Sequence, residues 1–412
     1  MQTNLAAWIR DTDMGKEADA ILRRCVHCGF CTATCPTYQV LGDELDSPRG
    51  RIYLIKQMLE GAEPTRSTQQ HLDRCLTCRN CETTCPSGVQ YGHLVDIGRR
   101  LVEEKVERPL AERTQRALLR KGLNSRLFAP ALKLGQAVRG LLPGALRRKV
   151  QPVRDPGAVP ATGHHARQVL MLAGCVQPAL MPSIDAATIR VLDAVGIGTQ
   201  VAAGSGCCGA LNFHLDDQPA ALDQMRANVD AWWQAIDSGQ VEAIVMNASG
   251  CGAMVKEYAH HLRHDARYAE RARRVVEKVV DVAELLAPHA EVLRQRIAGR
   301  LPARVAFHPP CTLQHWQPLR ALTEKLLTNL GFSLQPFADS HLCCGSAGAY
   351  SVLHPEIAGE LRDRKLAAIA AAQPDMVLSA NVGCIGHLQS GTGTPVRHWI
   401  EAVDEALRQQ LV

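Results

Sequence analysis

The sequence contains few aromatic residues, no long apolar run and no nucleotide-binding glycine motif, and each absence excludes a class of protein. Aromatic side chains make up 4% of the 412 residues, and no known nucleic-acid-binding motif occurs, so we expect no nucleic-acid partner. No window approaches the run of about 18 uninterrupted apolar residues that indicates a membrane-spanning helix. The glycine pairs in GVQYG and GQAVRG have neither the spacing nor the preceding strand of a dinucleotide-binding fingerprint.

Catalytic patterns and a secretory signal are also missing. No Ser–His–Asp arrangement and no pair of acid–base carboxylates can be recognised. The initial stretch MQTNLAAWIRDTDMGKEAD carries charges where a signal peptide needs an apolar core. The remaining composition, 46% hydrophobic and 21% charged, is ordinary for a soluble globular protein. The sequence therefore predicts a cytoplasmic chain of several domains with no flavin or nicotinamide site of its own.

Cysteine is the residue that this sequence has in unusual number, with sixteen copies. Because thiols stay reduced in the cytoplasm, this number predicts metal binding rather than disulfides. Eight cysteines lie between positions 25 and 85 and eight between 175 and 384, and none lies from 86 to 174. We infer two different metal-binding regions joined by a connecting segment.

The first cysteine block repeats one pattern, CVHCGFCTATCP at 25–36 and CLTCRNCETTCP at 75–86. In runs of this kind three thiolates hold one iron–sulfur cubane, and the fourth, beside a proline, binds the cluster of the other run. The pattern predicts two 4Fe–4S clusters, one on Cys25, Cys28, Cys31 and Cys85 and the other on Cys75, Cys78, Cys81 and Cys35. Two structural zinc sites are the alternative, but zinc ligands usually come as separated CxxC hairpins. His27 is interpreted as exposed and not as a ligand.

The segment between the two runs predicts a helical ferredoxin domain. In SPRGRIYLIKQMLEG the apolar residues recur at helical spacing, and the separation of the runs is too long for the compact bacterial ferredoxin. Residues 15–105 resemble the helical two-cluster ferredoxin domain of the succinate dehydrogenase iron–sulfur family. The resemblance implies a domain that conducts electrons and reacts with no substrate.

The second cysteine block is an internal repeat of α/β type. VLMLAGC, GCCGALNFH and AIVMNASGC in the first copy correspond to RVAFHPPC, LCCGSAGAY and MVLSANVGC in the second. Short apolar runs of buried-strand type alternate with helical stretches, and single cysteines follow the strands. Ligands bind at that edge of open parallel sheets, and helices after the CCG pairs would direct their N-termini at an anionic cluster. The predicted fold is thus an all-helical ferredoxin domain followed by an α/β pair of repeats with Rossmann-like parallel sheets.

These repeats resemble the cysteine-rich CCG domain of the heterodisulfide reductases and of flavoenzyme-associated iron–sulfur subunits. The family motif has a fifth cysteine per copy, where this chain has Met254 and His387, so the unusual five-cysteine cluster is not expected. The candidate ligands, four in each copy, are Cys175, Cys207, Cys208 and Cys251, and Cys311, Cys343, Cys344 and Cys384. We expect one further cluster at most, with a redox or docking role for the other copy. Packed, partly vestigial cysteines are the alternative, and Met254 or His387 as a ligand is a weaker one.

Predicted domain bounds follow from these blocks. They are 1–105 for the ferredoxin domain, 106–165 for a basic helical linker, and 166–300 and 301–412 for the two cysteine-rich domains. From Arg113 to Lys149 the linker has ten basic residues and no acidic one, with leucines interleaved. Such a segment suits peripheral contact with an anionic membrane, equally an acidic partner subunit, and also a merely solvated face.

One ferredoxin block followed by two CCG repeats resembles, over essentially the whole chain, the iron–sulfur subunits of membrane-associated flavin dehydrogenases. CCGALNFH at Cys207–His214 and CVHCGFCTATCPTY are most similar to the glycolate oxidase type. The resemblance implies a partner FAD subunit that oxidises glycolate to glyoxylate and a quinone-type electron acceptor. The alternatives are a heterodisulfide-reductase-like enzyme, an iron–sulfur subunit of a glycerol-3-phosphate or lactate dehydrogenase, and a zinc-bound scaffold.

Overall fold

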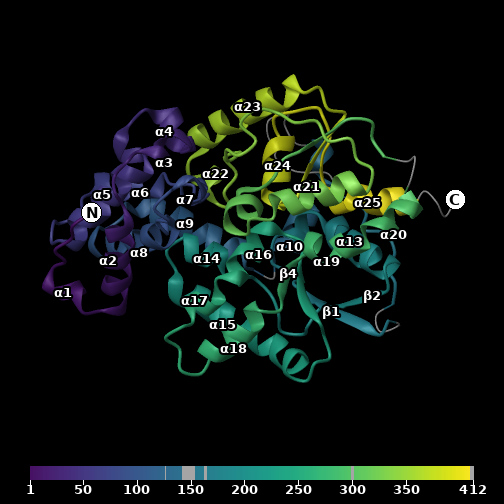
Figure 1. Cartoon of the computed structure of the whole chain (residues 1–412), viewed down its shortest axis with the longest axis horizontal. Helices are drawn as coiled ribbons and strands as arrows, with labels where there is room; N and C mark the ends of the chain where they lie inside the picture. Colours follow the sequence, from purple (N-terminus) through teal and green to yellow (C-terminus); the bar gives the residue numbers. More distant parts are fainter. Residues whose placement is uncertain (126, 142–153, 162–164, 298–300, 409–412) are drawn as a thin grey trace. The chain divides into compact units, whose positions relative to one another are not determined.

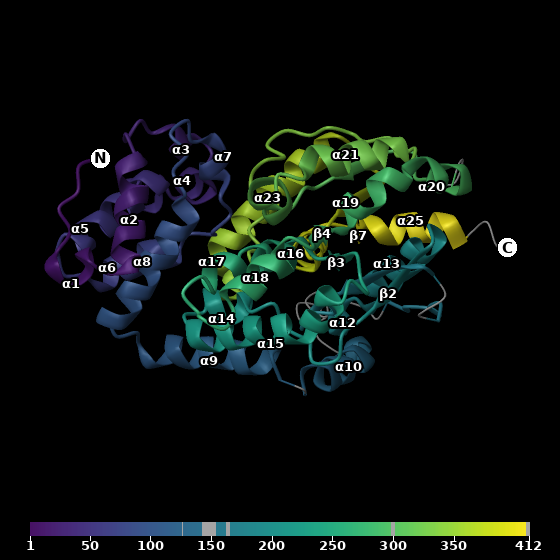
Figure 2. The ribbon, with the colours of Figure 1, turned by 60° about the horizontal axis from the view of Figure 1, so that its bottom comes forward.

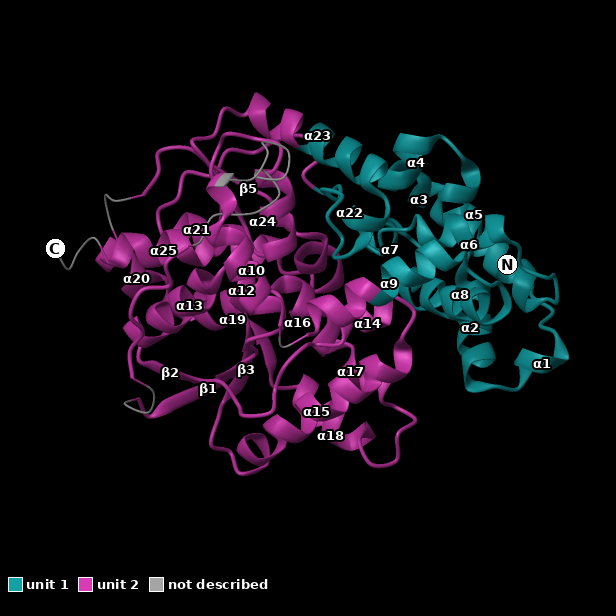
Figure 3. Ribbon diagram, turned by 180° about the vertical axis from the view of Figure 1, so that it is seen from behind, with its two compact units in different colours: residues 1–117, 341–365 teal, residues 118–340, 366–412 magenta. Residues whose placement is uncertain are grey.

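The computed structural model describes the chain except residues 126, 142–153, 162–164, 298–300 and 409–412 (Figure 1). The chain forms two compact units, which Figure 3 colours separately. Unit 1 comprises residues 1–117 and 341–365, and unit 2 comprises residues 118–340 and 366–412. The four predicted domain bounds stay a prediction. The return of residues 341–365 to unit 1 was not anticipated from the sequence.

Unit 1 is built from helices and short helical turns. Its core is formed by buried apolar side chains such as Leu22, Ile55, Leu59 and Leu94. The elements are α1 (Ala7–Arg10), α2 (Asp13–Arg24), α3 (Phe30–Ala33), α4 (Pro36–Leu41), η1 (Glu44–Asp46), α5 (Pro48–Leu59), α6 (Arg66–Asp73), α7 (Asn80–Thr84), α8 (Tyr91–Lys105), the first part of α9 (Leu110–Leu123), α22 (Tyr350–Leu353) and the first part of α23 (Pro355–Ala371).

Helix α5 begins where its sequence predicts. Pro48 occupies the first turn, and the side chain of Ser47 caps the helix by accepting a hydrogen bond from the Gly50 N–H. A Cβ atom at Gly50 would lie 2.0 Å from the carbonyl oxygen of Glu44, so only glycine lets the turn η1 pack on this helix. That packing brings Asp46, the last residue of η1, beside the buried face of α5.

Unit 2 contains two parallel sheets, with strand orders β2-β1-β3-β4 and β5-β6-β7. The strands are short and mostly buried, as expected of parallel sheets covered by helices. They are β1 (Arg167–Met171), β2 (Ile197–Gln200), β3 (Ala243–Met246), β4 (Val279–Asp281), β5 (Val305–Phe307), β6 (Met376–Ser379) and β7 (Val396–His398). The predicted fold class is therefore confirmed.

The helical elements of unit 2 connect these strands. They are α10 (Phe128–Ala137), η2 (Arg139–Leu141), α12 (Gln177–Leu180), α13 (Pro182–Ala194), α14 (Ala210–His214), α15 (Gln218–Asp237), α16 (Ser249–Lys256), α17 (Tyr258–His261), α18 (Ala269–Val276), α19 (Val282–Leu286), η3 (Ala287–His289), α20 (Ala290–Ile297), the π-helical turn η4 (Thr312–Trp316), α21 (Arg320–Asn329), α24 (Val382–Gln389) and α25 (Trp399–Arg408).

The two sheets repeat one topology. The order β1-β3-β4 in the first copy corresponds to β5-β6-β7 in the second, and a single parallel bridge from Val305 to Leu334 stands where β2 pairs with β1. Helices α13 and α25 pack against each other (Figure 2). Arg190 on α13 makes two hydrogen bonds to Asp404 on α25, at 2.8 and 2.7 Å. The buried ion pair thus joins the C-terminal helix to the first sheet's layer.

The predicted basic segment lies partly outside the described residues, because Arg126, Leu142, Arg147, Arg148 and Lys149 are not among them. Its described part carries leucines with exposed side chains, including Leu118 on α9, Leu127 just before α10 and Leu134 on α10. Among the helices that the structure describes, none is both long enough and apolar enough to cross a membrane.

Candidate metal centres

The two cysteine runs of unit 1 fold into the same loop. Each loop has two residues with positive φ, His27 (59°) and Gly29 (84°) in the first run and Thr77 (52°) and Arg79 (57°) in the second. A short helix follows in each case, α3 and α7 respectively. Left-handed backbone is uncommon for residues other than glycine, so its recurrence at Thr77 and Arg79 indicates that the surrounding structure imposes the loop.

The first group of cysteines surrounds a cavity in unit 1. Cys25, Cys28, Cys31 and Cys85, named here the Cys25 set, line about 430 Å³ of space that is partly open to solvent, and Cys81 also contributes. Burial and the neighbouring Cys25, Cys28 and Cys35 thiols raise the pKa of Cys31 to about 11. Cys28 is exposed, so this set lies close to the surface of the unit. The structure thus brings Cys85 of the second run to the cysteines of the first.

The second group is Cys75, Cys78, Cys81 and Cys35, named here the Cys75 set. Burial raises the pKa of Cys81 well above its usual range, and the neighbouring Cys78, Cys75 and Cys35 thiols raise it further. These three cysteines therefore lie close to Cys81, although Cys35 comes from the other run. Cys35 also neighbours Cys31 of its own run, and the crossed ligand assignment of the fourth cysteines stays a prediction.

Hydrogen-bond donors surround the sulfur atoms of the Cys75 set. The Tyr91 hydroxyl donates to the Cys75 Sγ at 3.6 Å, and the Thr77 N–H donates to the same sulfur at 3.4 Å. The Thr37 Oγ1 lies 3.3 Å from the Cys35 Sγ. Donors of this kind orient thiolate ligands and set the properties of the metal centre that they hold.

The donor chemistry of both sets fits an iron–sulfur cluster. Each set presents four cysteines, and the structure, which describes all sixteen cysteines, joins none of them in a disulfide. Soft thiolate ligands in fours are the ligands of iron–sulfur clusters and of zinc. The crossed sharing of cysteines between the two runs favours iron–sulfur clusters over two independent zinc hairpins.

The first cysteine set of unit 2 also comes together. Cys175 follows β1, Cys207 and Cys208 precede α14, and Cys251 lies in the first turn of α16. Hydrogen bonds join Cys207 to Cys175 and to Cys208, and these bonds lower the pKa of Cys207 to about 3. Hydrogen bonds to Cys207 and Cys251, with burial, raise the pKa of Cys208 well above its usual range. The four cysteines are thus neighbours beyond the ends of β1 and β3, and their role as ligands of one centre stays a prediction.

A buried polar network holds the CCG loop of this set in place. The Tyr258 hydroxyl donates to the Cys208 carbonyl oxygen at 2.9 Å, and the Asn228 side chain donates to the Cys207 carbonyl oxygen at 2.9 Å. Gly206 N–H in turn donates to Asn228 Oδ1 at 2.8 Å. Sequence reasoning missed Asn228 and Tyr258, which lie on α15 and α17 and are not part of any cysteine motif.

The second set of candidate cysteines in the CCG repeats is divided between the two units. Cys311 directly precedes η4 and Cys384 lies on α24, both in unit 2, whereas Cys343 and Cys344 belong to unit 1. All four are buried. Whether they form one site therefore stays a prediction. At the two positions of the missing fifth cysteines, Met254 is buried in the apolar core of unit 2 and His387 is half-buried on α24.

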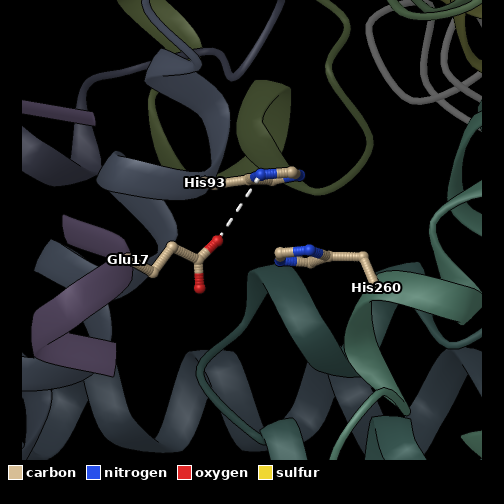
Figure 4. Close-up of side chains that lie close together, drawn as sticks. All are labelled: Glu17, His93 and His260. Carbon is tan, nitrogen blue, oxygen red and sulfur yellow. Dashed lines mark ion pairs between the residues drawn. The ribbon is translucent and has the colours of Figure 1, made fainter. Parts of the chain in front are cut away.

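Two other groups of potential ligands are explained by ion pairs. In unit 1, His93 Nδ1 on α8 lies 3.7 Å from Glu17 Oε1 on α2 (Figure 4), and His260, also drawn there, belongs to unit 2. Asp43, Asp46 and His71 also lie close together, but Asp46 already faces two arginine side chains. The carboxylate of Asp46 is thus already occupied by cationic side chains.

Arg51 is the residue near the Cys75 set that sequence reasoning missed. It lies on α5 and is fully buried, with Ile55 and Met58 on the same face of that helix. The signal that identifies it is an arginine at position i of a helical stripe whose positions i+4 and i+7 are apolar.

Comparison with known proteins identifies two protein families in the chain and several similar iron–sulfur subunits. A 4Fe–4S dicluster domain family matches residues 21–89, and a cysteine-rich domain family matches residues 169–256 and 305–389. The chain is 54% identical, over all of both chains, to the glycolate oxidase iron–sulfur subunit of Escherichia coli (strain K12). It is 30% identical to the probable glycolate oxidase iron–sulfur subunit of Bacillus subtilis (strain 168), over 90% of this chain and 89% of the relative. Lactate utilization protein A of Geobacillus thermodenitrificans (strain NG80-2) is 27% identical over 56% of this chain and 95% of its own.

Proposed function

Because the chain belongs to the family of glycolate oxidase iron–sulfur subunits, we propose that it conducts electrons from a partner FAD subunit, which oxidises glycolate to glyoxylate, to a quinone-type acceptor. As a member of this family the chain is an iron–sulfur subunit of an oxidoreductase complex. The observation that carries the proposal is the pair of crossed cysteine sets in unit 1.

In this proposal the Cys25 set and the Cys75 set each hold one 4Fe–4S cluster. Such clusters supply reversible transfer of one electron at a time. The chain's own residues provide the thiolates, bury three of the four cysteines of the Cys75 set, and orient its sulfur atoms through Tyr91, Thr77 and Thr37. None of these groups is placed to exchange a hydride or a proton with an organic substrate, so oxidation of the hydroxy acid is assigned to the partner.

The cysteine-rich region is proposed to hold one further metal centre, on Cys175, Cys207, Cys208 and Cys251. Support comes from the hydrogen bonds that join their thiols and from the network of Asn228 and Tyr258 beneath the loop. Cys311, Cys343, Cys344 and Cys384 are proposed to serve a redox or docking role.

Peripheral membrane contact is proposed for residues 113–149. Exposed leucines on α9 and α10 lie among basic residues, an arrangement that suits the surface of an anionic bilayer. A vesicle sedimentation assay, with and without anionic lipid and at low and high salt, tests this contact separately from electron transfer. Binding of the protein to vesicles that changes with neither lipid charge nor salt concentration would contradict the proposal.

The experiment that tests the proposed function uses the native complex, purified anaerobically with its partner subunits. Glycolate should reduce a quinone analogue, and replacement of Cys81 by serine should abolish that activity while leaving reduction of an artificial dye by the flavin subunit. Lactate serves as the matched substrate control. Equal quinone reduction by the cysteine variant, or reduction with lactate alone, would refute the assignment.

A further inference from the structure

Arg51 is a buried cation without solvent contact. Its side chain is 1% exposed and that of its ion-pair partner Asp46 is 0% exposed. The guanidinium donates three hydrogen bonds, to the His71 carbonyl oxygen at 2.7 Å, to Thr37 Oγ1 at 3.1 Å and to Asp46 Oδ1 at 3.2 Å. Burying such a group is costly in free energy, even when it is paired.

Asp46 does not cancel the positive charge around it. Its Oδ2 accepts a hydrogen bond from Arg74 at 3.0 Å, so one carboxylate faces two guanidinium groups. His71 Nδ1 lies 3.1 Å from Asp46 Oδ1 as well. One buried carboxylate therefore faces two cations, of which Arg51 is buried and Arg74 is 35% exposed.

A hydrogen-bond chain links this charge to the cysteine set. Thr37 Oγ1 accepts from Arg51, and it lies 2.9 Å from the Asp46 carbonyl oxygen and 3.3 Å from the Cys35 Sγ. Its single proton therefore points to that carbonyl or to the sulfur. Burial lowers the pKa of Arg51, but the neighbouring Tyr91, Cys75, Cys35 and Asp46 together raise it above its usual range. Two of these neighbours, Cys75 and Cys35, are members of the Cys75 set.

We propose that Arg51, with Thr37 as its intermediary, raises the reduction potential of the metal centre held by the Cys75 set. The inference rests on the proposed function, because it needs a redox-active cluster at those cysteines. Reduction adds one negative charge to a thiolate-bound cluster. A buried cation stabilises the reduced state more than a surface cation would, because little water screens it. The Cys25 set has an exposed member, and the cation that lines its cavity, Arg49, has a side chain that is 34% exposed and is therefore screened by water.

The test is a redox titration of the anaerobically purified full chain, followed by paramagnetic resonance, which reads each cluster separately. Arg51→Gln should lower the potential of the Cys75 cluster, and Arg51→Lys should lower it less because the charge is retained. Asp46→Asn should shift the same potential upward, since it removes a negative charge. Thr37→Val should lower it without a change of charge, whereas Thr37→Ser should not.

The opposite signs at Arg51 and Asp46 distinguish charge from structural damage, because loss of packing would not reverse direction between the two. Arg108→Gln is the matched control: it breaks a buried ion pair of the same unit, with Asp73 and Glu103. This variant should reduce stability and leave both potentials unchanged.

Failure of this inference can be separated from failure of the proposed function. If the wild-type chain shows fewer than two cluster signals, the proposed function is refuted. If it shows both, but Arg51→Lys, Asp46→Asn and Thr37→Val leave the Cys75 signal at its wild-type potential, this inference is wrong. Equal shifts of both clusters would also overturn it. Should Arg51→Gln fail to fold, the other three variants still decide.

Discussion

Replacement of Cys35 by serine should remove the cluster of the second cysteine run, at 75–86, and not the cluster of the first run, to which Cys35 belongs. Cys35 lies close to Cys78 and Cys81, which belong to the other run. Wild-type protein with two loaded clusters in unit 1 contains about eight irons there, and Cys35→Ser should lower the count by about four. Cys85→Ser should lower it by the same amount but remove the other signal, because Cys85 lines the cavity of the Cys25 set. Folding is coupled to cluster binding, so each variant should also unfold at a lower temperature.

The assay combines iron analysis with paramagnetic resonance of the reduced, anaerobically purified chain. Two further variants act as matched controls, because Cys28→Ser must lose the same signal as Cys85→Ser, and Cys78→Ser the same as Cys35→Ser. The comparison shows which variants lose the same signal, and it does not require knowing which spectrum belongs to which site. Should Cys35→Ser instead share its lost signal with Cys28→Ser, the crossed arrangement would be refuted. Loss of both signals in every variant would contradict the independence of the two sets.

Three more predictions concern unit 2. Burial raises the pKa of Asp185 to about 6, so the free energy of unfolding should fall as pH rises from about 4 to about 6. Asp185→Asn keeps an oxygen that accepts from the side-chain amides of Gln177 and Asn247. In urea titrations this variant should be more stable than wild type by up to about 3 kcal/mol at pH 7, but not at pH 4. Asp404→Ala leaves the largely buried Arg190 without its carboxylate and should cost about 3 kcal/mol in the same assay, with a loss below 1 kcal/mol contradicting the buried-pair interpretation. Joint replacement of Cys207 and Cys208 by serine should lower the iron content by about four per chain and leave both ferredoxin signals, whereas unchanged iron would end the proposal of a third centre.

Much of the fold could be predicted because the sequence repeats itself. The four-cysteine runs, the helical spacing of Ile52, Ile55 and Met58, and the strands ending near Cys175 and Cys251 are all local patterns. Local patterns determine which elements form, and the edge of a parallel sheet determines where the residues after its strands gather. The meeting of the first cysteine set of unit 2 follows from these two rules alone.

The features that could not be predicted depend on contacts between distant segments. Residues 341–365 pack in unit 1, where the Tyr350 hydroxyl donates to the Arg74 carbonyl oxygen at 3.0 Å and the Asn80 side chain donates to the His341 carbonyl oxygen at 3.3 Å. No periodicity or motif in either of the two contacting segments predicts such a contact. It places Cys343 and Cys344 in a different unit from Cys311 and Cys384, which the symmetry of the repeat does not suggest.

The two cysteine runs show how an identical motif can acquire two environments. Their loops share the same backbone conformation, and their cysteines have the same spacing, so the motif alone gives no reason for one cluster to differ from the other. The difference comes from residues outside the motif: Thr37, Arg51 and Tyr91 surround the Cys75 set, while Cys28 leaves the Cys25 set open to solvent. In the proposed function, the centre beside the buried Arg51 would hold an electron more tightly than a centre of equal charge beside a partly exposed cation. Neighbours of the motif, which the motif itself does not specify, would thus set the difference in reduction potential between the two proposed centres.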